Sequence, residues 1–252
     1  TKKLYVNGEL AVESDDSVEE NDTKPFSIGA GGDTGTAYFF KGDIDDLALW
    51  SRALSASEVA DVHANGIPTG GGGGGPLVPG LIAYWDFDDA SEIDGGTVVD
   101  KVAGMEGVVN GTGVTATDGQ FGSALDFGTE ASDTSVTIEY VNDWLQGASD
   151  DDQLSVSVWQ KLHEVRSTST LWFSAASAPG GQRNYQAHIP WGNSNIYFDT
   201  AGCCGGGDTR ISAAGGIDFL EWHHFVFIKN GENKSIYIDG ELFLEGVNTG
   251  TL

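Results

Sequence analysis

The sequence is poor in cysteine, in basic residues and in long apolar runs. Its two cysteines, Cys203 and Cys204, are adjacent, so they cannot staple distant loops, and no Cys-x-x-Cys or His-x-x-x-His spacing indicates zinc. Twelve Lys and Arg residues accompany 38 Asp and Glu, and the formal charge of −26 argues against nucleic acid or an anionic membrane surface as a partner. No run of about 18 apolar residues exists, so we expect no membrane insertion.

The residues that are abundant indicate a folded, turn-rich protein. Apolar residues make up 39% of the chain and aromatic residues 10%, which is ample for a core. The 37 glycines and the scattered Asn-Gly and Asp-Gly pairs predict many turns between short strands. The many carboxylates repel one another, which bound divalent cations or a salty exterior would relieve. Acidity that serves only solubility is the alternative.

One stretch of the sequence occurs twice. Residues 1–20 align without gaps on residues 233–252, at an offset of 232 positions, and six of the aligned residues are identical. The Asn7-Gly8 pair suits a two-residue type I′ turn, because both residues tolerate positive φ. A β-hairpin is therefore predicted at both ends of the chain.

Between the two hairpins the chain divides at a linker. Residues 69–80, TGGGGGGPLVPG, contain a six-glycine run and two prolines, a composition typical of linkers. Before it, one helix is predicted, with Ser55 as N-cap, Glu58 completing a capping box and Asn65-Gly66 ending it.

The other segments have the alternation of strands. In LSVSVWQKL the residues Leu154, Val156 and Val158 share one face, and the residues between them take the other. In GDIDDLALW, Ile44 and Leu47 are predicted to face the core with a polar pair between them. Regular short strands separated by turn signals indicate a β-sandwich or jelly roll.

Five motifs carry a resemblance that covers nearly the whole chain. They are GLIAYWDFDD, FGSALDFG, LSVSVWQKL, EWHHFVFIKNGENKSIYIDGELF and GDIDDLALWSRALSASEVADVHANG, and the last is the most specific. The chain resembles the laminin-G-like, concanavalin A-type (lectin/glucanase) jelly-roll domains common in large secreted bacterial proteins. The resemblance implies an all-β concanavalin A-like β-sandwich with one short helix, in an extracellular or cell-surface protein.

The order of these motifs is rotated relative to the family. The family's closing half stands first, in residues 1–68, and its opening half follows the linker, in residues 81–252. We interpret the chain as a window cut from a tandem array, in which 1–68 and 81–232 together hold one complete sandwich. Either the chain folds as one circularly permuted sandwich, or neighbouring copies complete each half. Competition of two hairpins for one position slightly favours head-to-tail contact.

Catalysis is not predicted. Retaining sandwich glycosidases need two carboxylates about 5–5.5 Å apart on one strand, and no predicted strand has that spacing. Asp86 and Asp88 are the closest pairing, but they lie at the family's opening turn. The pair His223-His224 is expected to be structural, with one imidazole pointing inward and one outward.

A calcium ion is implied by the resemblance, because some family members hold one where the first and last strands meet. The residues that match these positions are Asp45, Asp86 and Asp88, with Asp46 expected to point to solvent. Hard cations prefer such oxygen ligands. The alternative is that these carboxylates cap turns or solvate the surface.

A ligand site is predicted in HIPWGNSNIYFDTAGCCGGGDTR, residues 188–210. A disulfide between Cys203 and Cys204 would bend the backbone and present a flat sulfur surface, which the flanking glycines accommodate. The predicted platform for sugar rings consists of Trp191, Asn193, Tyr197, Asp199 and Arg210. A rigid loop that shapes the rim of the sandwich is the alternative.

Two function classes follow. The first is a non-catalytic extracellular repeat for adhesion or surface architecture, which assembles head-to-tail with copies of itself and binds glycans. The second is a carbohydrate-binding module or a domain of a polysaccharide-degrading enzyme. The fold alone does not choose between them, because jelly rolls host many functions.

Overall fold

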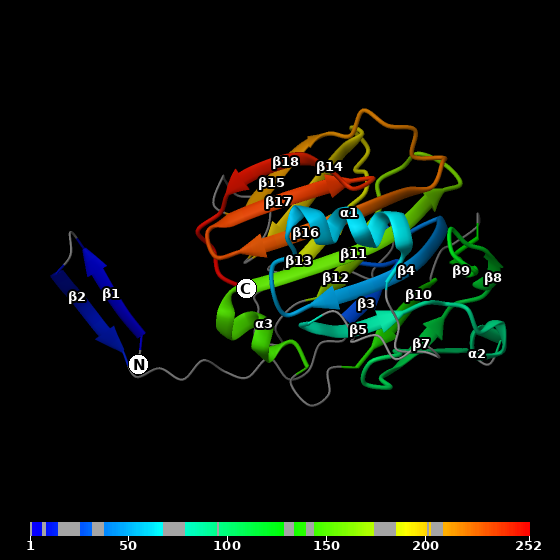
Figure 1. Cartoon of the computed structure of the whole chain (residues 1–252), viewed down its shortest axis with the longest axis horizontal. Coiled ribbons are helices and arrows are strands. Elements are labelled where there is room, and N and C mark those ends of the chain that lie inside the picture. Colours follow the sequence, from blue (N-terminus) through cyan, green and yellow to red (C-terminus); the bar gives the residue numbers. More distant parts are fainter. Residues whose placement is uncertain are drawn as a thin grey trace.

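The computed structural model of the 252-residue chain describes residues 2–6, 9–14, 26–31, 38–67, 79–94, 96–128, 134–139, 144–173, 185–200, 202 and 209–252. Its body is a β-sandwich of two antiparallel sheets that pack face to face (Figure 1). The all-β prediction is therefore confirmed. Most of the predicted linker lies outside the described residues, and so do both cysteines.

The first sheet, here called sheet I, has eight strands. Their order is β15 (Arg210–Ala214), β14 (Asn195–Thr200), β13 (Tyr185–His188), β12 (Leu171–Phe173), β3 (Phe26–Ile28), β10 (Ser135–Ile138), β7 (Glu106–Asn110) and β6 (Thr97–Val99).

The second sheet, sheet II, also has eight strands. The order is β18 (Glu241–Val247), β17 (Asn233–Ile238), β16 (His223–Asn230), β11 (Gln153–Leu162), β4 (Gly42–Trp50), β9 (Ser123–Asp126) and β8 (Thr115–Asp118), and β5 (Leu81–Trp85) pairs with the second half of β4.

Two strands from the N-terminal part of the chain lie inside these sheets. β3 pairs with β12 on one side and β10 on the other, and β4 pairs with β11, β9 and β5. Both sheets therefore consist mainly of strands that follow the linker, and each is completed by one strand of the same chain that precedes it. The circular permutation and the tandem array remain predictions beyond that observation.

The core between the sheets follows the predicted alternation. Leu154, Val156 and Val158 are all in the core, as the alternating pattern predicted. Ile44 and Leu47 are in the core as well, although three positions apart. A bulge explains this spacing, because the pairing of β4 with β11 shifts at Asp45–Asp46, and Asp46 has a φ of 48°.

Helix α1 (Ala56–Asn65) covers the outer face of sheet II (Figure 1). Ser55 caps it and forms the predicted capping box with Glu58, and Gly66 ends it, so this prediction is confirmed in detail. Val59 and Val62 pack on a second apolar cluster that includes Trp50. Two short helices were not predicted, α2 (Ala90–Asp94) and α3 (Gln146–Asp151).

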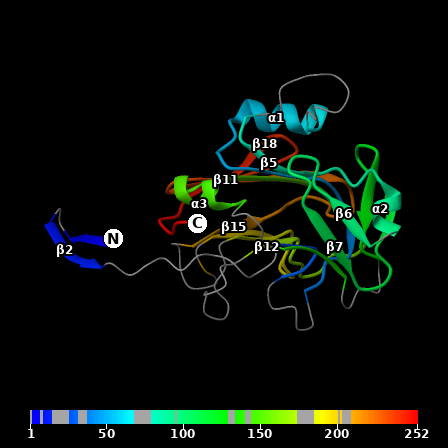
Figure 2. The ribbon, with the colours of Figure 1, turned by 90° about the horizontal axis from the view of Figure 1, so that it is seen from below.

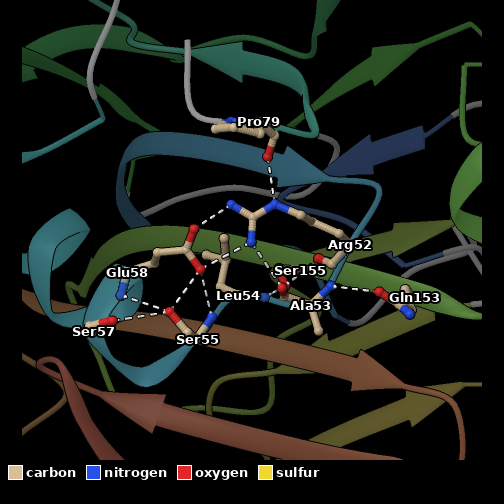
Figure 3. Close-up of polar contacts among 9 residues, drawn as sticks. All are labelled: Arg52, Ala53, Leu54, Ser55, Ser57, Glu58, Pro79, Gln153 and Ser155. Carbon is tan, nitrogen blue, oxygen red and sulfur yellow. Dashed lines mark hydrogen bonds and ion pairs between the residues drawn. The ribbon is translucent and has the colours of Figure 1, made fainter. Parts of the chain in front are cut away.

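A polar network fixes the start of α1 to the sandwich (Figure 3). The Arg52 guanidinium donates to both carboxylate oxygens of Glu58 and, through Nε, to the carbonyl of Pro79 at 2.5 Å. Ser155 of β11 donates to the carbonyl of Arg52 and accepts from the amide of Leu54. This network joins the end of β4, the helix and the segment leading into β5.

The two copies of the repeated hairpin lie in different surroundings. β1 (Lys2–Val6) and β2 (Glu9–Ser14) pair only with each other among the described strands, as a two-stranded sheet drawn apart from the sandwich in Figure 1. β17 and β18 instead form one edge of sheet II. Among the described residues, no helix has the length and apolarity that crossing a bilayer would require.

Candidate functional site

The outer face of sheet I carries polar side chains that are buried, which is unusual for the face of a sheet that points away from the core. In β13, Tyr185 and Ala187 lie in the core, so Gln186 and His188 take the outer face. In β14, Phe198 lies in the core and Asp199 takes the outer face. Gln186, His188 and Asp199 are nevertheless buried, with 1%, 6% and 0% of their surface exposed.

The structure brings the five predicted ligand residues together on this face. They lie on β14, on the first residue of β15 and in the turn between β13 and β14. Arg210 donates from Nε and Nη2 to the two carboxylate oxygens of Asp199, at 2.5 and 2.6 Å. Its guanidinium lies 4.5 Å from the centre of the Tyr197 ring, and Asn193 donates to the Tyr197 hydroxyl at 2.7 Å.

Electrostatics hold this arrangement in place. The hydrogen bonds from Arg210 to the buried Asp199 carboxylate raise the pKa of the guanidinium, so Arg210 keeps its positive charge. A bidentate pair has a fixed geometry. Arg210 therefore holds Tyr197 from one side while Asn193 holds its hydroxyl, and the ring is positioned rigidly.

Trp191 belongs to an aromatic cluster that the sequence did not reveal in full. Its ring lies 4.7 Å from that of Tyr38 and 4.6 Å from that of His188, and His188 lies 6.1 Å from Tyr197. Trp191 is half-buried, so part of the ring remains accessible. Together with its neighbours it forms a surface of rings, here called the Trp191 surface: Tyr38, His188, Trp191, Asn193 and Tyr197.

Two members of the Trp191 surface were missed. His188 had a usable signal, because the alternation in YQAHIPW places it on the same face as Tyr197 across β13 and β14, where the two residues pair. Tyr38 had none, since it precedes Trp191 by about 150 positions and only the closed sandwich brings the two together. Cys203 and Cys204, and hence the predicted disulfide, lie outside the described residues.

The predicted calcium ligands surround a different feature, the turn between β8 and β9. Asp45 accepts hydrogen bonds from the amides of Gln120 and Phe121, at 2.8 and 3.1 Å. Asp88 accepts from the amide of Ser123 at 2.7 Å. Both carboxylates therefore cap this turn, which is the alternative left open by the sequence.

Glycine is required in this turn for two reasons. Gly122 has a φ of +66°, and a Cβ atom there would overlap the Asp88 carboxylate. The second residue of the FGSALDFG motif is therefore a glycine, which allows an acidic side chain to approach the backbone.

The expectation that Asp46 points to solvent is wrong. Asp46 is buried and accepts a hydrogen bond from the Tyr84 hydroxyl at 2.5 Å. Asp46 lies on the face of sheet II that α1 covers, where Tyr84 and the end of α1 at Gly66 shield it from solvent.

Four carboxylates lie close together with little positive charge near them, those of Asp45, Asp46, Asp86 and Asp88. Burial, and then repulsion from Asp46, raises the pKa of Asp45 to about 8. Burial raises the pKa of Asp46 to about 6, with a further contribution from Asp88 and Asp86. Asp86 is itself 3.4 Å from the Lys101 ammonium.

Another group of ligating side chains was not predicted. Among the described residues, Asp43, Asp126 and His163 are the one group of three whose ligand atoms all lie within 4.8 Å of one another. The Asp45, Asp86 and Asp88 oxygens do not converge in this way. Asp43 already pairs with the Lys161 ammonium at 2.9 Å and with His163 at 3.1 Å, so its charge is balanced.

The adjacent histidines lie as the alternation predicted. His224 is fully buried, and its Nε2 lies 2.7 Å from the Ser157 hydroxyl oxygen. Burial lowers its pKa to about 3, so it stays neutral. His223 is half-buried and its Nδ1 lies 2.7 Å from a carboxylate oxygen of Asp239. Both have local partners within or beside sheet II, whereas the Trp191 surface lies on sheet I.

The comparison with protein families gives one match. The family model of the concanavalin A-like lectin/glucanases superfamily matches residues 1–60 and 130–252, which is most of the chain. No curated protein and no solved structure matches the chain.

Proposed function

Because the chain belongs to the concanavalin A-like lectin/glucanase superfamily, a group of carbohydrate-binding and adhesion-type modules that also includes glucanases, we propose that it is a non-catalytic carbohydrate-binding module. The proposed binding surface is the Trp191 surface on the outer face of sheet I. Trp191 and Tyr197 would stack on the apolar faces of sugar rings, and Asn193 would bind hydroxyl groups.

The observation that carries this proposal is the rigid support of the rings. Tyr197 is held by Arg210 and by Asn193, and Trp191 packs between Tyr38 and His188. Aromatic side chains that are fixed before the ligand arrives lose little conformational entropy on binding. Such support is expected of a binding surface.

The carboxylates of this face support the non-catalytic part of the proposal. Glycoside hydrolysis uses two carboxylates, one of which donates a proton. Among the described residues of β12–β15 the only carboxylate is Asp199, and both of its oxygens accept hydrogen bonds from Arg210. A carboxylate with both oxygens engaged by one guanidinium is not placed to donate a proton to a glycosidic oxygen.

Binding to a panel of polysaccharides tests the proposal. We expect saturable binding to at least one glycan, weakened about fivefold or more in Trp191→Ala, since stacking on an aromatic ring contributes ~1 kcal/mol or more. Trp222→Ala is the matched control, because Trp222 is also half-buried but lies beside Lys161 of sheet II. Equal binding by the wild type and Trp191→Ala would show that the Trp191 surface does not bind the glycan.

Calcium belongs to the same proposal as a structural ion. Asp45, Asp86 and Asp88 would hold it beside the β8–β9 turn, with Asp46 next to them, and Asp45 also caps the turn. The fit rests on the mutual repulsion of these carboxylates, since a divalent cation supplies the positive charge that they lack. The ion would join β4, the end of β5 and the turn, and would add stability rather than chemistry.

The setting that we propose is an extracellular or cell-surface protein built from such modules, used in adhesion or surface architecture. Head-to-tail contact between copies is part of this proposal. It is supported by the edge strand β18, on which Leu242 and Val247 are exposed. Attachment to a polysaccharide-degrading enzyme would use the same binding surface. Light scattering over a range of concentrations tests the assembly, and a constant monomer mass would contradict it.

A further inference from the structure

The two hairpins have the same pairing of backbone residues between their strands. In β1–β2, Leu4 pairs with Val12 and Tyr5 with Leu10. In β17–β18, Ile236 pairs with Leu244 and Tyr237 with Leu242. Each of these residues of β17–β18 lies 232 positions after its counterpart in β1–β2. The register shifts at the same place in both hairpins, between the fourth and fifth residues of the repeat.

The residues that β17 buries are those that the N-terminal copy retains. Lys234 and Tyr237 are buried and identical to Lys2 and Tyr5. Ile236 and Ile238 are buried and correspond to Leu4 and Val6, which are also branched and apolar. The half-buried Ser235 corresponds to Lys3. Similarity at the buried positions is what packing against β16 demands.

Lys234 makes this argument specific. Its ammonium donates to the carbonyls of Phe198 and Thr209 and lies 4.4 Å from the Phe198 ring. A lysine buried in this way is unusual in a strand, because its charge must be satisfied locally. The N-terminal copy carries a lysine at the same place, Lys2.

We infer that residues 2–14 are a second occupant of the edge position beside β16, able to replace β17 and β18 in the same sandwich. The occupant comes from the same chain because residues 2–14 precede β3, which already lies in sheet I of that sandwich. Only residues 15–25 separate them, and a tether of this length gives an effective concentration in the millimolar range. A second copy in solution is far more dilute.

The C-terminal copy holds the edge position for identifiable reasons. Asn230 pairs with Asn233 across a two-residue turn, so a very short connection keeps β17 close to β16. Leu252 packs on the core and its amide donates to Asp152. Both advantages are local to the C-terminal hairpin.

Two positions within the hairpin also favour the C-terminal copy. Phe243 packs against the core, and the N-terminal copy has Ala11 there. A Cβ atom at Gly246 would lie 2.5 Å from Cγ2 of Ile211, and the N-terminal copy has Ser14 there. These four differences decide which hairpin docks, since the backbone register does not.

The exchange leaves the number of occupied edge positions unchanged. One hairpin docks and the other is released, so its free energy depends only on the differences between the two copies. Replacement would free residues 233–252 as a hairpin that could enter a neighbouring sandwich. The inference does not rest on carbohydrate binding, and binding at the Trp191 surface is expected to survive the exchange.

Hydrogen exchange on the full chain, read by mass spectrometry, tests the inference. The variant Phe243→Ala/Gly246→Ser gives the C-terminal hairpin the residues of the N-terminal one. We expect its residues 2–14 to exchange about tenfold or more slowly than in the wild type, and residues 233–247 to exchange faster. The mass measured by light scattering should equal that of the wild type at the same concentration.

Two further variants keep the test decisive. Adding Tyr5→Asp to the first variant should abolish the protection of residues 2–14, because the acidic side chain would enter the position of Tyr237, beneath α1. The converse variant, Ala11→Phe/Ser14→Gly, leaves the sandwich sequence intact and should slow exchange of residues 2–14 even if the first variant folds poorly.

Two results would overturn the inference. In the first, residues 2–14 remain as unprotected as in the wild type in both the first and the converse variants. In the second, they become protected only as the mass doubles, which assigns the edge position to a second copy. Glycan binding, measured on the same samples, separates failure of this inference from failure of the proposed function.

Discussion

Sheet II carries helix α1 on its outer face (Figure 2), whereas the outer face of sheet I carries polar and aromatic side chains. Under α1 the contacts are apolar, and Val59 and Val62 pack on Trp50 and Tyr237. Over sheet I the buried groups include Asp199, whose charge is balanced by Arg210. Two sheets that share one core thus differ entirely on their other faces.

This difference teaches how the two faces divide their tasks. An apolar face that the chain's own helix covers contributes stability through burial. A face with fixed rings and a bidentate ion pair adds less stability and offers directional contacts to a ligand. Substitutions on the two faces should therefore have separable effects on folding and on binding.

Breaking the contact between α1 and sheet II should have the largest effect. Trp50 is fully buried there, so Trp50→Ala should lower the free energy of unfolding by about 3–5 kcal/mol. Denaturant unfolding measures this. Trp222→Ala, at a half-buried position, is expected to cost less than ~1 kcal/mol, and equal losses would contradict the role assigned to the helix-covered face.

The ion pair of sheet I should matter less for stability and more for binding. Asp199→Ala removes two charge-assisted hydrogen bonds to Arg210, which is partly exposed, so the expected loss is about 2 kcal/mol. Glycan affinity should fall as well, because Arg210 would no longer hold Tyr197. A variant that loses stability but keeps full affinity would show that the pair does not position the ring.

The acidic cluster beside sheet II predicts a pH dependence that calcium reverses. The pKa values of Asp45 and Asp46 in the folded protein, about 8 and about 6, exceed the unfolded value of 3.8. The folded state then binds these protons more tightly, so in EDTA stability is greatest below about pH 4 and falls as the pH rises towards 8.

Melting temperatures across this range check the prediction. Calcium binds the ionised carboxylates, so it should raise the melting temperature more at pH 8 than at pH 5. Asp45→Asn should flatten the fall seen in EDTA. A melting temperature that changes with neither calcium nor EDTA would contradict the proposed calcium ion.

The network at the start of α1 should have the smallest effect. Glu58 and Arg52 are about one-third and one-quarter exposed, so Glu58→Gln should cost less than ~1 kcal/mol. The hydrogen bonds from Arg52 lower the pKa of Glu58 to about 2. The stability that this pair adds is therefore present above about pH 4.5 and is lost as the pH falls towards 2. Acid titration of the wild type and of Glu58→Gln should converge near pH 2.

Much of the fold could be predicted because its signals are local. The cap at Ser55, the box with Glu58 and the stop at Gly66 all lie within one helix. The alternation in β11 identified its core face. The short strands β6, β8 and β15 were missed, since three to five residues with little apolar alternation give a weak signal.

The candidate site was predicted only where its members are neighbours in the sequence. Tyr197 and Asp199 share a face of one strand, and Arg210 pairs with Asp199 across β14 and β15. Tyr38 comes from the other end of the chain. The burial of Asp46 depends on its cover by Tyr84 and the end of α1, which the alternation of β4 does not disclose.

By itself the sequence determined the all-β class, the superfamily, the helix and its ends, and the duplication of a hairpin, because each of these resides in residues close along the chain or in a repeated pattern. Tertiary structure alone decided which copy of the hairpin docks beside β16, which residues surround Trp191, and that Asp46 is buried. These depend on packing between distant segments, where a single close contact, such as that of Gly246 with Ile211, separates two nearly identical sequences.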